Sequence, residues 1–176
     1  MSTQIHQTAR DLVNSLITLG ATQDKISASR AAMAKLRQAI LNPILAAPYV
    51  APFTENLNER QEDCFYLIAS LFALNPNHQS GVSFGGAFKH LREKSDGMDK
   101  RFSMILGARQ EQLPDLIRHG IRLLATESLA LDWEKLLLDL LYWDTLNKSV
   151  QRKWARDYYR HSEAKNSEKV EGDESL

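Results

Sequence analysis

Basic side chains on several predicted helices offer the chemistry that the sequence supports best. Arginine outnumbers lysine in the helices that matter, and its planar guanidinium donates two parallel hydrogen bonds to a phosphate group. Arg101, Arg109, Arg118 and Arg122 fall on consecutive predicted helices between residues 100 and 125. Neighbouring helices would align them in one stripe. The spacing therefore predicts a phosphate-binding surface, although helical proteins also carry solvated basic residues that bind nothing.

Charge is unevenly distributed along a chain whose formal net charge is zero. Residues 162–176 hold five acidic and two basic side chains, which leaves a net charge of +3 on the other 161 residues. Residues 25–54 hold four basic residues and no acidic residue, while residues 148–160 hold five basic residues and one acidic residue. Local patches govern electrostatic recognition more than the total charge does, so overall neutrality does not exclude a polyanionic partner.

Residues that would support catalysis or metal binding are scattered. The single cysteine, Cys64, lies in the apolar run CFYLIASLFAL, which predicts a buried thiol. The glycine-rich stretch at residues 81–86 lacks the lysine and the serine or threonine that a nucleotide-binding loop requires after its glycines. Asp132 precedes a helical pattern and suits a helix cap better than a general base. No two of the five histidines lie within four residues of each other, so we predict no catalytic residue, metal site or cofactor; they are His6, His78, His90, His119 and His161.

The elements that must position the basic residues are predicted to be helices, about eight to nine of them, in an all-α fold. Apolar residues recur at steps of three and four, and strand patterns are nearly absent. Gly20 is predicted to end the first helix, and one helix is predicted to carry Lys100, Arg101 and Arg109. The other expected helices span residues 29–41, 58–74, 84–94, 113–125 and 133–143, with a last one that follows Asn147.

The stretch from Leu131 to Tyr159 is the predicted anchor of the core. Its first helix places leucines on one face, and its second spaces Val150, Trp154 and Tyr158 by four residues, so the pair forms a helical hairpin with a basic rim. Glycine is unfavourable inside a helix, so Gly85-Gly86 predicts the close approach of another backbone or of a ligand.

The expected organisation is an N-terminal helical bundle at residues 1–80, a C-terminal helical bundle at residues 81–161 and an acidic disordered tail at residues 162–176. The soft boundary is the polar loop that ends at Gly81. The sequence contains no run of about 18 apolar residues and no signal-peptide pattern, so we expect a cytoplasmic protein with no membrane association.

The order of several short motifs resembles that of the CasB family, the small subunit of the type I-E CRISPR surveillance complex Cascade. The resemblance covers about residues 27–160 and is sharpest from Ser83 onward. It is carried by residues 81–87 (GVSFGGA), residues 100–102 (KRF) with Arg109, residues 116–118 (LIR), residues 121–124 (IRLL), residues 131–133 (LDW) with Trp143, and residues 150–156 (VQRKWAR).

This resemblance implies two small helical bundles and two copies per complex, arranged head to tail. It also implies a non-enzymatic role in antiviral defence, with other Cascade subunits and crRNA as partners and no small-molecule substrate. Basic residues would hold the displaced, single-stranded non-target DNA without reading its sequence, and so stabilise the R-loop. Residues at matching positions are expected to contact the DNA strand; they are Arg37, Arg101, Arg109 and Arg122. Lys35 and Arg118 are neighbours inferred from charge and spacing, and Lys89 takes the contribution of its helix because Gly86 stands where the family has a basic residue.

Two other interpretations remain open. The chain could be a structural scaffold whose basic face meets acidic partner subunits and never touches DNA. It could also be a helical hydrolase or nuclease, although no active site can be assembled from the residue pattern.

Overall fold

The computed structural model describes residues 2–160, and within that range the fold is all-α, as predicted. Residues 2–160 form nine α-helices and two short 3₁₀ helices, and the one β-bridge in this range joins His78 to Leu131. In chain order the elements are α1 (Ser2–Thr22), α2 (Ser27–Gln38), η1 (Pro43–Ala46), α3 (Ala47–Val50), η2 (Ala51–Phe53), α4 (Glu59–Phe72), α5 (Phe84–Arg92), α6 (Met98–Leu106), α7 (Leu113–Thr126), α8 (Trp133–Leu141) and α9 (Ser149–Tyr159).

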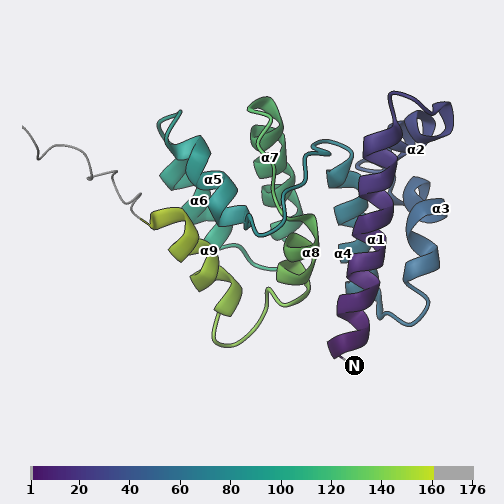
Figure 1. Cartoon of the computed structure of the whole chain (residues 1–176). Coiled ribbons are helices and arrows are strands. Elements are labelled where there is room, and N and C mark those ends of the chain that lie inside the picture. Colours follow the sequence, from purple (N-terminus) through teal and green to yellow (C-terminus); the bar gives the residue numbers. More distant parts are fainter. Residues whose placement is uncertain (1, 161–176) are drawn as a thin grey trace, which may run out of the picture.

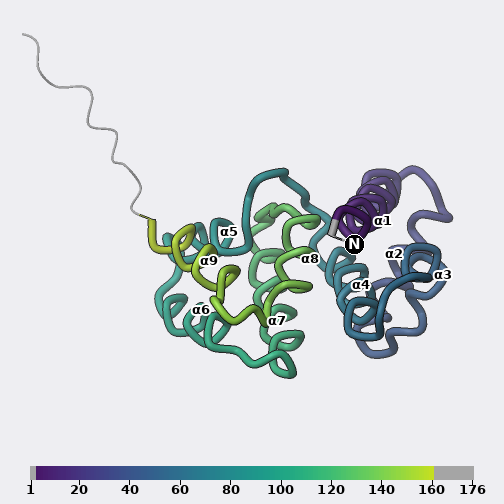
Figure 2. The backbone as a smooth tube through the Cα atoms, turned by 90° about the horizontal axis from the view of Figure 1, so that it is seen from below, coloured from purple at the N-terminus to yellow at the C-terminus, as the bar shows by residue number. Residues whose placement is uncertain are grey.

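Helices α1 to α4 lie on one side of the molecule and α5, α6 and α9 on the other, with α7 and α8 between them (Figures 1 and 2). Helix α8 packs against both α1 and α4, and α5 packs extensively against α9. The buried apolar side chains form one continuous cluster from α1 to α9. The division into bundles at residues 80 and 81 stays a prediction, and the predicted tail at residues 162–176 lies outside the described residues.

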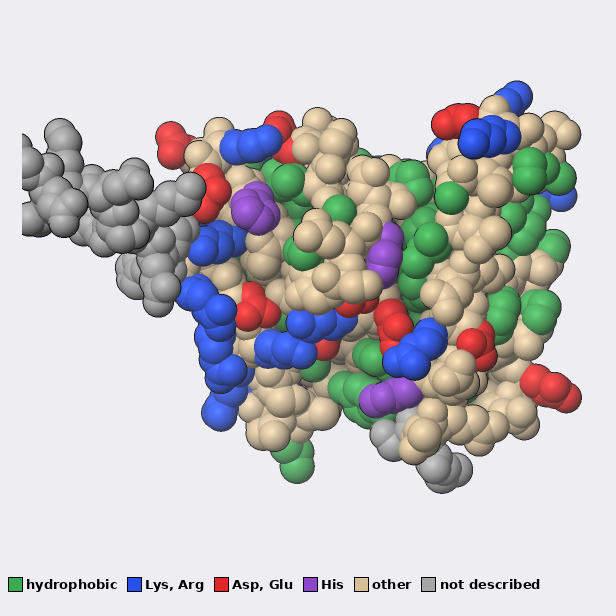
Figure 3. All heavy atoms as spheres, in the orientation of Figure 1, with side chains coloured by type: hydrophobic (Ala, Val, Ile, Leu, Met, Phe, Trp, Pro, Cys, Tyr) green, Lys and Arg blue, Asp and Glu red, His purple; other side chains and the backbone are tan. Residues whose placement is uncertain are grey.

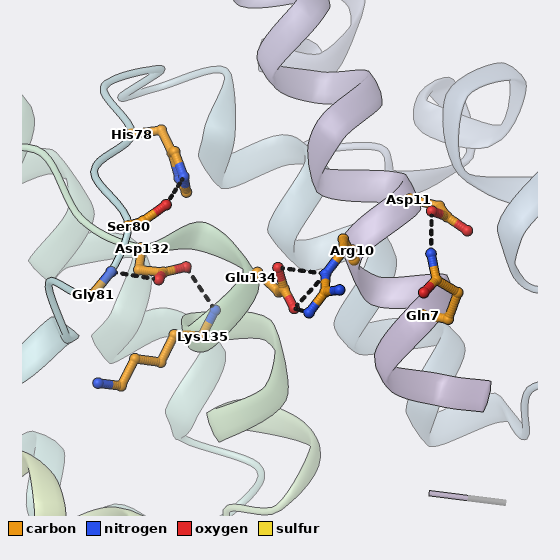
Figure 4. A network of polar contacts seen from close by, with 9 residues as sticks. All are labelled: Gln7, Arg10, Asp11, His78, Ser80, Gly81, Asp132, Glu134 and Lys135. Atoms are coloured by element: carbon orange, nitrogen blue, oxygen red, sulfur yellow. Dashed lines mark hydrogen bonds and ion pairs between the residues drawn. The ribbon is translucent and has the colours of Figure 1, made fainter. Parts of the chain in front are cut away.

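Side-chain caps begin the helices where the sequence predicted them. Asn58 forms a reciprocal capping box with Gln61 at the start of α4, and the Ser83 hydroxyl accepts the Gly86 N–H at the start of α5. Asp132 caps α8 by accepting the Lys135 N–H at 3.0 Å, and its second carboxylate oxygen accepts the Gly81 N–H at 2.7 Å (Figure 4). Its role as a cap is therefore confirmed.

The predicted hairpin anchors the core. Trp133, Trp143 and Trp154 are all buried. The Trp154 ring lies 4.7 Å from the Phe84 ring of α5 and 5.0 Å from the Trp143 ring, centroid to centroid. The Gln151 amide donates to the Trp143 carbonyl at 2.9 Å, which fixes the turn between α8 and α9.

Two roles predicted for residues near helix ends are wrong, those of Gly20 and Arg109. Helix α1 continues through Gly20 to Thr22, and a Cβ at Gly20 would lie 3.1 Å from the Phe72 ring, so this glycine provides room for α4 rather than a stop. Helix α6 ends at Leu106, because Gly107 follows as its C-cap. Arg109 therefore lies in the connection to α7 and not on a helix.

The structure gives a reason for the first glycine of the Gly85-Gly86 pair. A Cβ at this position would lie 2.3 Å from the Trp154 carbonyl oxygen, so the backbones of α5 and α9 touch there. At Gly86 the nearest atom to a Cβ would be the Ser83 hydroxyl, at 3.4 Å. The close approach predicted from sequence is thus that of another backbone, and it involves only the first glycine.

Asp139 is a buried carboxyl group within this packing. Its Oδ2 accepts the Trp154 indole N–H at 2.6 Å. Burial raises the pKa of Asp139 above its ordinary value, although the Trp154 hydrogen bond and Lys153 oppose the shift. The folded chain therefore binds this proton more tightly than the unfolded chain does.

We expect Asp139→Asn to change how stability depends on pH. Because the folded pKa of Asp139 is raised, this group makes the wild type less stable as pH rises from about 3.8 through the folded pKa. An asparagine oxygen still accepts the Trp154 N–H but cannot ionise. Urea unfolding between pH 4 and pH 7.5 should show a stability difference that grows with pH in favour of the variant. A difference independent of pH would contradict this account.

Candidate nucleic-acid interface

Helix α7 presents two of the predicted arginines on its outer flank. Ile117, Ile121 and Leu124 are fully buried and fix the rotation of the helix about its axis. Arg118 and Arg122 lie one turn apart beside this buried stripe, Arg122 exposed and Arg118 partly buried. Arg122 has no carboxylate partner among residues 2–160, so its charge is available to a ligand.

Arg118 differs from Arg122 because its guanidinium is partly enclosed. One terminal nitrogen donates to Asp115 Oδ1 at 2.6 Å, and the side chain is 24% exposed. Its Nε atom is buried and has no hydrogen-bond acceptor. Within residues 2–160 this donor is therefore left without a partner.

Arg101 on α6 and Arg109 in the connection to α7 are both exposed. Within residues 2–160 the one hydrogen bond of the Arg101 guanidinium goes to the Met98 sulfur, at 3.8 Å. Arg109 makes its hydrogen bond through the backbone, whose N–H donates to the Gln112 side chain. Within residues 2–160 neither guanidinium meets a carboxylate, so both can take up a phosphate without breaking an ion pair.

The predicted residues of α2 and α5 have other surroundings. Lys35 is exposed, whereas Arg37 Nε donates to the Ala73 carbonyl at 3.0 Å and a terminal nitrogen donates to Gln23 at 3.2 Å. Arg37 thus contacts the C-terminal end of α4. Because both hydrogen-bond partners are neutral, its positive charge is not balanced by them. Lys89 is partly buried on α5.

The structure does not gather all seven predicted residues on one surface. Helices α2 and α6 lie at opposite ends of the molecule in both views, so Lys35 and Arg37 are remote from Arg101 (Figures 1 and 2). The group on α6, α7 and their connection is contiguous along the chain and spans two packed helices. It consists of Arg101, Arg109, Arg118 and Arg122.

A second basic surface lies along α9 and the residue that follows it. Arg152, Arg156 and Arg160 are spaced by four residues, are exposed and have no carboxylate partner among residues 2–160. Figure 3 shows Lys and Arg side chains in a column over this helix. The sequence indicated a basic rim here but assigned it no contact. Its orientation is set by Val150, Trp154 and Tyr158, which are buried on the opposite face.

A cavity of about 410 Å³ lies beside Arg118, between α4 and the start of α7. Its walls are largely apolar, and Ile40, Pro43, Leu67 and Pro114 contribute to them. Charged groups in its lining are Arg60, Asp63, Glu111 and Arg118, so the formal charges balance. Arg60 was not predicted from sequence, because its nearest partner, the Gln110 side chain at 3.0 Å, is 50 residues away.

Groups suited to covalent or metal chemistry are not assembled in the described part of the chain. Residues 2–160 contain no cluster of three histidine, cysteine, aspartate or glutamate side chains able to hold a metal ion. Cys64 is buried, as predicted, and burial raises the pKa of its thiol to about 11, which disfavours the nucleophilic thiolate. In the same range, no helix combines the length and the apolar character needed to span a bilayer.

Comparison with known proteins gives the family. The family model described as CRISPR-associated protein Cse2 matches residues 32–159. The chain belongs to the Cse2 family. A relative from Thermus thermophilus, the CRISPR-associated protein Cse2, is 34% identical over 129 residues, which are 72% of this chain and 75% of that protein.

Solved structures agree with the Cse2 assignment. The crystal structure of CasB from Thermus thermophilus is 30% identical, with a TM-score of 0.73 over 86% of this chain and 97% of that chain. A chain of a CRISPR RNA-guided surveillance complex has the same fold at 24% identity, with a TM-score of 0.72 over 88% of this chain and 92% of that chain. The resemblance to the CasB family inferred from sequence is therefore confirmed.

Proposed function

We propose that this Cse2-family chain is a non-enzymatic subunit of a type I-E CRISPR Cascade complex and holds the displaced non-target DNA strand of the R-loop. The observation that carries the proposal is the set of exposed guanidinia on Arg101, Arg109 and Arg122, none of which meets a carboxylate within residues 2–160. A chain of the same fold belongs to a CRISPR RNA-guided surveillance complex, which supports the assembly role.

The physical logic is that of a nearly balanced strand exchange. The RNA–DNA heteroduplex is about as stable as the DNA duplex that it replaces, so modest binding of the released strand shifts the equilibrium toward the R-loop. Arginines without carboxylate partners neutralise phosphates without reading bases. The proposed partners are therefore the other Cascade subunits, crRNA, single-stranded DNA and a second copy of the chain, in the cytoplasm.

The direct test is fluorescence anisotropy of the full chain with a labelled single-stranded DNA of mixed sequence across a range of salt concentrations. Each neutralised phosphate releases counterions, so we expect the log–log plot of affinity against salt to fall with a slope of about −0.7 per contact. Affinity that does not change with salt, or no binding at low salt, would contradict the proposal.

A scaffold role is the second candidate, and exposed apolar side chains favour it. Leu41, in the turn between α2 and η1, is 92% exposed, and Ile44 in η1 is 66% exposed. Leu146, between α8 and α9, is 104% exposed. Such side chains are typical of protein contacts. Failure to bind DNA, together with capture of partner subunits that Leu41→Ser/Ile44→Ser abolishes, would favour this role.

Deleting residues 162–176 should tighten DNA binding. This segment carries five acidic and two basic side chains, and it follows α9, where the second basic surface lies. Removing a net charge of −3 reduces competition with phosphates for the arginines. The anisotropy assay at low salt should show higher affinity for the truncated chain, and an unchanged affinity would refute the prediction.

A further inference from the structure

Helix α9 carries an exposed face to which the proposed function assigns no partner. Arg152, Arg156 and Tyr159 are all exposed and follow one another at steps of four and three residues, which places them on one face of the helix. Arg160 extends this row at the end of the helix. Because Trp154 is buried on the opposite side, packing holds the exposed face toward solvent.

The positive charges of this face are not paired within residues 2–160. None of the guanidinia of Arg152, Arg156 and Arg160 meets a carboxylate in that range. The one carboxylate on α9, that of Asp157, accepts the Ser83 hydroxyl at 2.6 Å. Successive arginines are separated by about 6 Å along the helix axis. A regular row of cations suits a partner with one negative charge per repeating unit, as in the backbone of a nucleic acid.

Tyr159 presents an aromatic ring on the same face. It is 41% exposed, and its hydroxyl forms no hydrogen bond within residues 2–160, whereas Tyr158 is buried and donates to Asp99 at 2.7 Å. The Arg92 guanidinium lies over the Tyr159 ring, 5.6 Å from its centroid. A ring that contacts a cation and is still open to solvent can stack against a nucleobase.

The end of α9 lies beside the helix that carries Arg101. Helices α6 and α9 pack against each other, and the Tyr159 ring lies 6.5 Å from the ring of Phe102, the residue after Arg101. A single strand bound at Arg101 can therefore continue along α9 without leaving the protein surface. This placement favours a nucleic acid over an acidic protein as the partner, because one strand contacts both helices.

We infer that α9 is a second part of the single-strand site, in which Arg152, Arg156 and Arg160 bind phosphates and Tyr159 stacks against a base. This inference rests on the proposed function, because the occupant is the same strand. It adds a contact that does not depend on charge. Every base has a face that stacks on an aromatic ring, so binding stays independent of sequence.

Tyr159→Leu tests the stacking contact. We expect the variant to bind a labelled single-stranded DNA of mixed sequence about five- to tenfold more weakly than the wild type at the same salt concentration. An abasic strand of the same length keeps its phosphates, so the variant and the wild type should bind it equally. The log–log salt dependence should not change, because no charge is removed.

Two substitutions control for the loss of a tyrosine. Tyr159→Phe keeps the ring and should bind both strands as the wild type does. Tyr142→Leu removes a ring that is 39% exposed but lies against His6 of α1, so it should also leave DNA binding unchanged. Circular dichroism checks that each variant remains helical.

The arginines of α9 have a different readout. Arg152→Ala/Arg156→Ala/Arg160→Ala should weaken binding of the normal strand and of the abasic strand. It should also make the log–log salt dependence shallower by about 2, because three phosphate contacts are lost.

Several results would overturn the inference. Wild-type affinity in Tyr159→Leu, or equal losses for the normal and the abasic strand, would exclude stacking. Wild-type affinity and salt dependence in the α9 arginine variant would exclude the phosphate contacts. The proposed function would then stand if Arg101→Ala/Arg109→Ala/Arg122→Ala still bound DNA more weakly. Loss of partner-subunit binding alone in the α9 variants would assign this face to a protein. Failure of the wild type to bind either strand would overturn both the inference and the proposed function.

Discussion

Arg101→Ala/Arg109→Ala/Arg122→Ala should bind single-stranded DNA roughly 10- to 100-fold more weakly than the wild type at low salt. The reason is the loss of three exposed guanidinia that face no carboxylate within residues 2–160, at roughly 0.5–1 kcal/mol each. Removing three phosphate contacts should also make the log–log salt dependence shallower by about 2. The change in slope counts contacts directly, so it is a sharper readout than affinity at one salt concentration.

The matched control removes the same number of charges where they are already paired. Arg10, Arg92 and Lys94 form ion pairs with Glu134, Asp99 and Glu127. We expect Arg10→Ala/Arg92→Ala/Lys94→Ala to change affinity only slightly, provided that the variant remains helical. Equal losses of affinity in both triple variants would show that net charge, and not the position of the arginines, determines binding. A loss only in Arg152→Ala/Arg156→Ala/Arg160→Ala would move the interface to α9.

Gly85→Ala should be among the most destabilising single methyl additions in the described chain. The new Cβ would lie 2.3 Å from the Trp154 carbonyl oxygen, a backbone atom of α9, and the packed helices α5 and α9 cannot move independently. Forced separation of α5 from α9 would loosen the rings of Phe84 and Trp154, which lie 4.7 Å apart. We expect a loss of about 2–4 kcal/mol in the free energy of unfolding, measured by urea denaturation.

Gly86→Ala is the natural control, because it makes the same chemical change one residue along the same helix. Its nearest neighbour would be the Ser83 hydroxyl, at 3.4 Å, which is ordinary contact. Alanine favours helix over glycine, so we expect a gain of about 0.5–1 kcal/mol. Similar losses in the two variants would show that the α5–α9 contact does not determine the cost.

Local signals in the sequence were enough to predict the caps and the core hairpin. As helix caps, these residues accept N–H groups within three residues of themselves; they are Asn58, Ser83 and Asp132. Trp154 lies in a four-residue apolar spacing that is visible in the sequence alone. Gly20 misled the prediction because its role depends on Phe72, 52 residues away. A helix continues through a glycine when packing there requires the space.

The candidate site was predictable in its residue types but not in its grouping. Three arginines are exposed and have no carboxylate partner in residues 2–160, as a phosphate-binding role requires; they are Arg101, Arg109 and Arg122. In contrast, Arg37 donates a hydrogen bond to a carbonyl 36 residues away, and the Nε atom of Arg118 is buried without an acceptor in that range. These distinctions arise from contacts between distant helices. The spacing of charges along one helix cannot reveal them.

The ion pair between Arg10 and Glu134 has a consequence for how the chain acquires its fold. It joins residues 124 positions apart and sits where α1 packs against α8 (Figure 4). During synthesis α1 leaves the ribosome more than 100 residues before α8 does. Until α8 is available, the part of the apolar face of α1 that packs against α8 stays exposed to solvent. Packing of helices α1 to α4 therefore cannot be completed before α8 has been synthesised. We therefore expect docking of α1 to be a late, post-nucleation step with high contact order.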